Sequence, residues 1–126
     1  MATLPGVRLL RSAQLTSRAP YAYAAVAEGV SALVFTAGAC PLDGNGATVA
    51  VGDVRGQAEQ VMTNLRHALQ AADAYVATSR QEDLHAAWDV VSRHFGEHDV
   101  PSTLLGVSVL GYRDQLVEVE AVAALV

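Results

Sequence analysis

Alternating apolar and polar residues mark the last strand that the sequence predicts. From residue 117 onward every second residue is apolar, and the positions between them include Glu118 and Glu120. Successive side chains of a β-strand point to opposite faces of a sheet, so this pattern predicts one buried face and one face that carries both carboxylates. The buried face would consist of Val117, Val119, Ala121 and Ala123.

The remaining pattern predicts further strands and two amphipathic helices. Apolar residues at helical spacing indicate a helix that Asp53 caps and that continues to Ala72. A second helix begins at residues 79–82, where Ser79 and Glu82 form a capping box, and ends at Gly96. Strands are expected at residues 7–10, 21–30, 32–38, 74–77, 100–107 and 116–123, with a short strand at 48–51 that returns from a hairpin turn at 43–46.

This order of elements predicts a single α+β domain over residues 1–126, with the helices on one face of a sheet. The hydrophobic content of 52 % is high for 126 residues and suggests a dense core or a buried subunit interface. No apolar run approaches the ~20 residues that span a bilayer, no secretory signal is visible, and the single cysteine, Cys40, fits a reducing compartment. We therefore expect a cytoplasmic protein that does not bind membranes.

Charge and residue types exclude several classes of function. The net charge is −5, and the eight basic residues are all arginines scattered along the chain. Nucleic-acid binding is not expected, because it needs clustered positive charge. The absence of lysine excludes a Schiff base on a lysine side chain, and with it ordinary pyridoxal-phosphate chemistry.

The remaining chemical candidates are few. Glu118 and Glu120, roughly 7 Å apart on one strand face, suit acid–base work if one is desolvated, and otherwise form an ordinary wet face. Cys40, followed by a proline, is more typical of a packed thiol than of a nucleophile. His94 and His98 do not form the H-E-x-x-H motif, and Gly96 is expected to end the helix between them, so they need not share a face. Neither a metal nor a cofactor is expected. Trp88 lies on the apolar helix stripe and is expected in the core.

Several short motifs run in a fixed order across nearly the whole chain. They are Pro20-Tyr21, Ala25-Val26, residues 33–38 (LVFTAG), Gly52-Asp53 with Gln57, Asn64-Leu65, Pro101-Ser102-Thr103 and residues 117–121 (VEVEA). No single motif is specific, but the ordered set resembles the Rid family, also called YjgF or L-PSP proteins. The resemblance implies a chorismate-mutase-like fold, in which a mixed β-sheet carries two helices on one face, and a homotrimer with small-molecule clefts between subunits.

The best-known activity of that family is hydrolysis of reactive enamine and imine intermediates to a keto acid and ammonia. By resemblance, the pocket tyrosine corresponds to Tyr21, the glycine after the short strand to Gly38, and the glutamate that positions water to Glu118. Glu118 is thus the expected catalytic residue. The expected substrate-binding positions are Tyr21, Ala37, Gly38, Trp88, Thr103 and Leu105.

At four of these positions the sequence departs from the family pattern. Ala37 stands where the family has a serine before the glycine, and Trp88 stands where it has an asparagine on the second helix. Leu105 stands where the family has a small residue, two positions after its substrate-binding arginine. Thr103 stands where the family has the arginine that binds the substrate carboxylate. An arginine makes two charge-assisted hydrogen bonds to a carboxylate, whereas threonine offers one neutral hydroxyl. Arg113, in a predicted turn roughly 17 Å along the chain from the closing glutamate, is not expected to replace it.

We therefore expect a trimeric small-molecule-binding protein, either an imine or enamine deaminase with a non-standard substrate or a ligand sensor or interaction module without turnover. Weak or absent activity on 2-iminopropanoate is expected, since that substrate is anionic. The ribonuclease or translation-inhibitor function that is sometimes attached to the family finds little support in an acidic chain without a basic patch.

The predicted connection between the helices is too short for the family arrangement. A helix that ends at Ala72 is about 29 Å long, and the six residues 73–78 can return at most about 21 Å. We expect that residues are missing between Leu69 and Tyr75, either a loop with half a strand omitted from the sequence or a true deletion. An intact mass of 13.2 kDa for the purified protein would contradict the omission.

Overall fold

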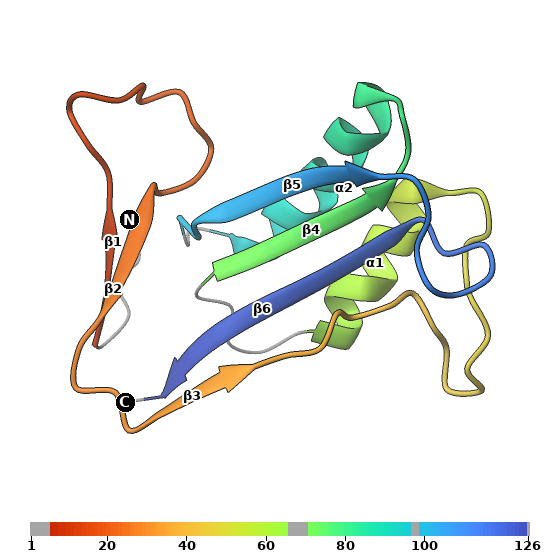
Figure 1. Cartoon of the computed structure of the whole chain (residues 1–126), viewed down its shortest axis with the longest axis horizontal. Helices are drawn as coiled ribbons and strands as arrows, with labels where there is room; N and C mark the ends of the chain where they lie inside the picture. Colours follow the sequence, from red (N-terminus) through yellow and green to blue (C-terminus); the bar gives the residue numbers. More distant parts are fainter. Residues whose placement is uncertain (1–5, 66–70, 97–98, 126) are drawn as a thin grey trace.

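A four-stranded mixed sheet, covered on one face by two helices, forms the body of the protein in a computed structural model that describes residues 6–65, 71–96 and 99–125 (Figure 1). A separate two-stranded hairpin precedes it. The α+β fold predicted from the sequence is confirmed. The elements are β1 (Val7–Leu10), β2 (Ala24–Ala27), β3 (Ala32–Phe35), α1 (Val54–Leu65), β4 (Ala71–Ala77), α2 (Gln81–Phe95), β5 (Ser102–Val107) and β6 (Val117–Leu125).

The strand order in the main sheet is β3-β6-β4-β5. The last strand in the chain, β6, lies inside the sheet and pairs antiparallel with both β3 and β4. Strands β4 and β5 are parallel, because α2 connects them across the covered face. Among the described residues, no helix is long and apolar enough to cross a membrane.

The core lies between β6 and the two helices. Val117 and Val119 of β6 are fully buried, and Ala121 and Ala123 continue the same face, as the alternation predicts. Glu118 and Glu120 lie on the opposite face and are half-buried. The core cluster consists of Ala58, Val61, Met62, Val90, Val91, Phe95, Val100, Val117 and Val119.

The first helix is shorter and the next strand longer than the sequence pattern indicated. The described helix ends at Leu65, and Ala72 belongs to β4, which runs for seven residues from Ala71 to Ala77. Pairing with β6 on one side and β5 on the other overrides the helical propensity of the alanines. The expectation that this strand is present only at residues 74–77 is therefore wrong. Residues 66–70, including Leu69, lie outside the described residues, so the expected missing loop stays a prediction.

Two smaller expectations are also corrected. Residues 48–51 form no strand, because only Thr48 pairs with Leu42 and the chain turns away at Ala50, where φ is 49°. The second helix has Arg80 at its N-cap, without a capping side chain, in place of Ser79. The hydroxyl of Thr78 accepts from the Arg80 N–H (3.0 Å) and donates to Asp83 (2.7 Å), so threonine organises this end of the helix.

The β1–β2 hairpin is attached to the body through an ion pair. The guanidinium of Arg11 donates to both carboxylate oxygens of Asp99 at 2.6 Å and to the carbonyl of Ala19 at 2.8 Å. The carbonyl of Asp99 in turn accepts from the Ala22 N–H at 3.0 Å. These bonds fix the segment that carries Tyr21 close to the chain that enters β5.

Gln57 of α1 is fully buried and satisfies the backbone of the turn before β6. Its amide Nε2 donates to the carbonyl of Asp114 at 2.8 Å, and its Oε1 accepts from the Leu116 N–H at 2.7 Å. Through these two part-buried bonds the side chain of Gln57 connects α1 to the backbone at the start of β6.

Replacement of Gln57 by leucine should destabilise the protein. The change removes the side-chain partners of a part-buried N–H and a part-buried carbonyl, and we expect a loss of about 1–3 kcal/mol in the free energy of unfolding. Urea denaturation followed by circular dichroism measures it. Gln60→Ala is the control, because it removes an exposed hydrogen bond from Gln60 to Asn64 on the same helix. It should lower the free energy of unfolding by less than about 1 kcal/mol. Equal losses in the two variants would contradict the role given to Gln57.

Candidate functional site

Glu118 lies against Gly38 because the β3 side of the sheet contains a bulge. Thr36 is bonded to Ala121 through both its N–H and its hydroxyl, which accepts from the Ala121 N–H at 2.9 Å. The pairing resumes at Ala39, which exchanges backbone bonds with Val119. The three residue steps from Thr36 to Ala39 thus lie opposite the two steps from Ala121 to Val119 on β6, and this extra residue is a β-bulge. Strand β3 consequently stops at Phe35 and does not continue to Gly38.

Gly38 has no room for a side chain. A Cβ atom built on it would lie 2.6 Å from Cγ and 2.7 Å from Oε2 of Glu118, far inside van der Waals contact. The glycine therefore allows the carboxylate to fold over the bulge. The structure brings these two predicted site residues together, with the exposed Ala37 next to them in the chain.

Two side chains that the sequence reasoning did not assign to the site hold the carboxylate of Glu118. Cys40 donates from Sγ to Oε1 at 3.1 Å, and Gln115 donates from Nε2 to the same oxygen at 3.4 Å. Burial and the bond to Glu118 raise the pKa of Cys40 to about 11, so the thiol stays protonated at neutral pH. The sequence did not identify Gln115, because no local pattern distinguishes a buried glutamine next to a turn from one on the surface.

The second carboxylate of the strand has a different environment. The phenol of Tyr75 on β4 donates to Oε1 of Glu120 at 2.8 Å. Tyr75 is also the residue of β4 that lies directly opposite Glu118 in the register. The tyrosine therefore stands between the two glutamates on this face of the sheet.

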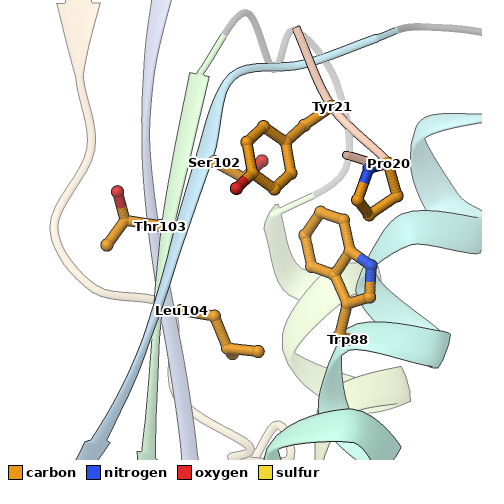
Figure 2. A pocket seen from close by; sticks show the side chains of 6 residues that line it. All are labelled: Pro20, Tyr21, Trp88, Ser102, Thr103 and Leu104. Atoms are coloured by element: carbon orange, nitrogen blue, oxygen red, sulfur yellow. The ribbon is translucent and has the colours of Figure 1, made fainter. Parts of the chain in front are cut away.

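Tyr21 and Trp88 lie together in a pocket on the helix side of β5. Their rings meet edge to face with centroids 6.2 Å apart, and Trp88 continues the contact to Phe95 at 6.5 Å. The open cavity beside them has a volume of about 430 Å³ (Figure 2). It is lined by Pro20, Tyr21, Trp88, Ser102, Thr103 and Leu104. Trp88 is half-buried and packs against the core as predicted, and it also forms a wall of this pocket.

The side chain of Thr103 points away from Trp88 and Leu104, to the other side of β5 (Figure 2). Alternation along the strand places Leu105 on that same side, where it is exposed. In the register, Leu105 is opposite Tyr75, and Tyr75 is opposite Glu118. Two strand spacings, roughly 10 Å, therefore separate Leu105 from the carboxylate.

One chain thus divides the predicted site between two places. We use the name open face for the side of the main sheet that the helices do not cover, and it carries Gly38, Glu118, Thr103 and Leu105. Tyr21 and Trp88 occupy the pocket on the helix side. The single chain does not bring Tyr21 to Glu118.

The open face combines apolar side chains with carboxylates and has no cation on its strands. Phe35 is 72 % exposed, and Leu33, Leu105 and Val122 are exposed on the same side. The four strands of the main sheet contain no arginine in their sequences ALVF, AADAYVA, STLLGV and VEVEAVAAL. Arg113 lies in the exposed turn before β6 and is not on these strands.

The histidines provide no metal centre within the described ranges. No group of three or more histidine, cysteine, aspartate or glutamate side chains is placed to hold a metal ion there. His94 instead lies 2.9 Å from Glu59 of α1, and this bond lowers the pKa of Glu59. His85 is exposed on α2. Glu97, His98 and His67 lie outside the described residues.

Comparisons with known proteins agree with this fold. The family model described as Endoribonuclease L-PSP matches residues 11–125. Among solved structures, the chain is similar to YyfB from Yersinia pestis, a protein of unknown function of the conserved Rid protein family. The two share 21 % identity over 95 % of this chain and 99 % of that one, with a TM-score of 0.82.

Two further structures show the same fold. Yeast Mmf1 is 21 % identical over 94 % of this chain and 98 % of its own, with a TM-score of 0.65. Rv2704 from Mycobacterium tuberculosis, a member of the YjgF/YER057c/UK114 family, is 18 % identical over 94 % and 99 %, with a TM-score of 0.61. No curated protein matches the sequence. Because the family match covers almost the whole length, the chain belongs to the Rid family, the YjgF or endoribonuclease L-PSP proteins.

Proposed function

We propose that this protein is a homotrimer that binds a small imine or enamine of low negative charge in clefts between its subunits and hydrolyses it at Glu118. One observation carries the proposal: the carboxylate of Glu118 is held in a bulge on the open face, over a glycine, and away from the aromatic pocket of its own chain. A second copy packed on the open face would supply the walls that a single chain does not bring there.

The exposed apolar residues of the open face support self-association. Leu33, Phe35, Leu105 and Val122 come from three strands of one sheet and lie on the same side. Soluble monomers rarely expose large contiguous apolar patches, and such patches commonly mark interfaces between proteins. Burial of this face would also surround Glu118 with apolar side chains and shield the cleft from bulk solvent, while single water molecules could still enter.

The chemistry needs only the glutamate and a water molecule. An enamine enters this sequence as its imine tautomer. Glu118 takes a proton from water while the water oxygen bonds to the imine carbon, and the C=N π electrons move to nitrogen, which takes the proton from Glu118. The resulting carbinolamine loses ammonia as its hydroxyl proton passes through Glu118 to nitrogen, the C–N bond breaks and the C=O bond forms. Atoms balance as imine plus water gives carbonyl compound plus ammonia, without metal or cofactor.

The charges on the sheet restrict the substrate. Glu118 and Glu120 are the charged side chains whose positions are described on the open face, and neither has a cationic partner among the described residues. An anionic substrate would meet repulsion there without the clamp that a guanidinium provides. A neutral or larger apolar imine therefore suits the cleft better than a simple imino acid.

A ligand-binding protein without turnover is the second candidate. The observation that favours it is Thr103, whose hydroxyl replaces the family's arginine on the open face. Although the matching family model is described as an endoribonuclease, a chain of net charge −5 with scattered arginines offers little to bind phosphates.

Light scattering should give about three times the monomer mass of 13.2 kDa. We expect Phe35→Asp to dissociate the assembly, because it replaces the most exposed apolar side chain of this face with a charge. Val109→Asp is the matched control, since Val109 is 77 % exposed in the connection before β6 and lies outside the open face. A wild-type monomer at micromolar concentration would refute both the trimer and the shared cleft.

Turnover of 2-iminopropanoate should be weak or absent in the wild type. The loss of a bidentate charged contact costs on the order of 2–5 kcal/mol, which corresponds to roughly 30- to several-thousand-fold in rate if the contact is felt in the transition state. An amino-acid oxidase or dehydratase coupled to ammonia release measures it for the wild type, Thr103→Arg and Glu118→Ala.

We expect Thr103→Arg to increase the rate on this anionic imine and Glu118→Ala to abolish the gain. Neutral imines should be hydrolysed by the wild type and not by Glu118→Ala. A wild-type rate on 2-iminopropanoate equal to that of an arginine-bearing relative would contradict the role given to Thr103. Binding of imines without ammonia release would favour the second candidate.

A further inference from the structure

The two oxygens of Glu118 are in different environments. Oε1 accepts hydrogen bonds from Cys40 at 3.1 Å and from Gln115 at 3.4 Å. Oε2 lies over Gly38, and the bonds from Cys40 and Gln115 both go to the other oxygen. These two donors thus hold Oε1 and not Oε2.

We propose that Gln115 and Cys40 are positioning residues that fix Oε1 of Glu118, so that Oε2 is the oxygen that binds and activates the hydrolytic water. This inference rests on the proposed hydrolysis and adds the residues that orient its glutamate. A carboxylate without fixed donors rotates about its terminal bond and presents either oxygen, whereas two donors on one oxygen select a single orientation.

Gln115 is itself rigidly placed. It is 4 % exposed, its Oε1 accepts from the Tyr112 N–H at 3.1 Å, and its Nε2 also donates to the Val117 carbonyl at 3.1 Å. The amide orientation is therefore determined by the backbone on both sides of it. A side chain held in this way can hold another, which is how supporting residues locate catalytic groups.

Cys40 is held by its backbone. Ala39 before it exchanges backbone bonds with Val119, Pro41 after it is buried, and the side chain of Asn64 on α1 donates to the Cys40 carbonyl at 3.0 Å. The thiol stays a donor at neutral pH because burial and Glu118 raise the pKa of Cys40 to about 11. Since both donors are neutral, they orient the carboxylate without cancelling the charge that makes it a base.

The infrared S–H stretch reports this arrangement without any catalysis. Cys40 is the only cysteine, so the protein has a single S–H band, and donation to a carboxylate lowers its frequency. We expect Glu118→Ala to raise that frequency and to move the thiol titration from near 11 to lower pH. Gln115→Leu should also shift the band, because the amide no longer holds the glutamate.

Gln57→Leu is the matched control. Gln57 and Gln115 are both buried and both bond to the backbone around the turn before β6, but within the described part of the chain Gln115 is bonded to Glu118, whereas the bonds of Gln57 go to backbone groups. The control variant should lower stability and leave the S–H band unchanged. The same band shift in both variants would show that Gln115 acts only through the fold and would overturn the proposal.

Kinetics on a neutral imine test the consequence. We expect Gln115→Leu and Cys40→Ala each to lower kcat roughly tenfold with KM changed less than about twofold, as for other supporting residues. Cys40→Ser keeps a donor at the same place and should retain most of the activity. Full kcat in Cys40→Ala and in Gln115→Leu would overturn the inference.

The two proposals fail in different ways. If the wild type releases no ammonia from any imine, the proposed hydrolysis and the activation of water by Oε2 fail together. The S–H band then still decides whether Cys40 and Glu118 are bonded as stated, and a band at the frequency of a free thiol would overturn that part as well.

Discussion

Val117 and Val119 of β6 lie fully buried beneath α1 and α2. This packing determines to which face of the sheet each of the remaining side chains of the strand points. Because the strand has a period of two, burying the valines sends Glu118 and Glu120 to the open face. A slip of one residue would place both carboxylates in the core, at a cost that no partner there offsets. The position of the candidate catalytic group is therefore a consequence of the hydrophobic core.

Buried amides then connect this core to the open face. Gln57 joins α1 to the turn before β6, and Gln115 joins the same turn to the carboxylate of Glu118. Each amide makes bonds that the backbone of the turn cannot make for itself. Gln57 contributes to the stability of the turn, whereas Gln115 contacts the glutamate directly.

The candidate site residues are divided between the two faces of the main sheet. The aromatic pocket of Tyr21 and Trp88 belongs to the helix side, whereas Glu118 belongs to the open face, and β4 and β5 lie between them. A sheet cannot present one residue on both faces. A site that used both groups would have to draw them from different copies of the chain, and the exposed apolar residues lie on the same face as Glu118.

Local patterns in the sequence determined the α+β class, the two faces of β6, the turn at residues 43–46 and the stripes of both helices, since each depends on residues close together in the chain. Ordered motifs indicated the family, and the resemblance named Gly38 and Glu118 as site residues, while their contact came from the structure. Only the tertiary structure decided that Ala72 joins a strand, that residues 48–51 do not, and that Gln115 and Cys40 hold the glutamate. These outcomes depend on strand pairing and on side-chain contacts between distant residues, for which a local pattern carries no signal, because the energy that decides them comes from partners elsewhere in the chain.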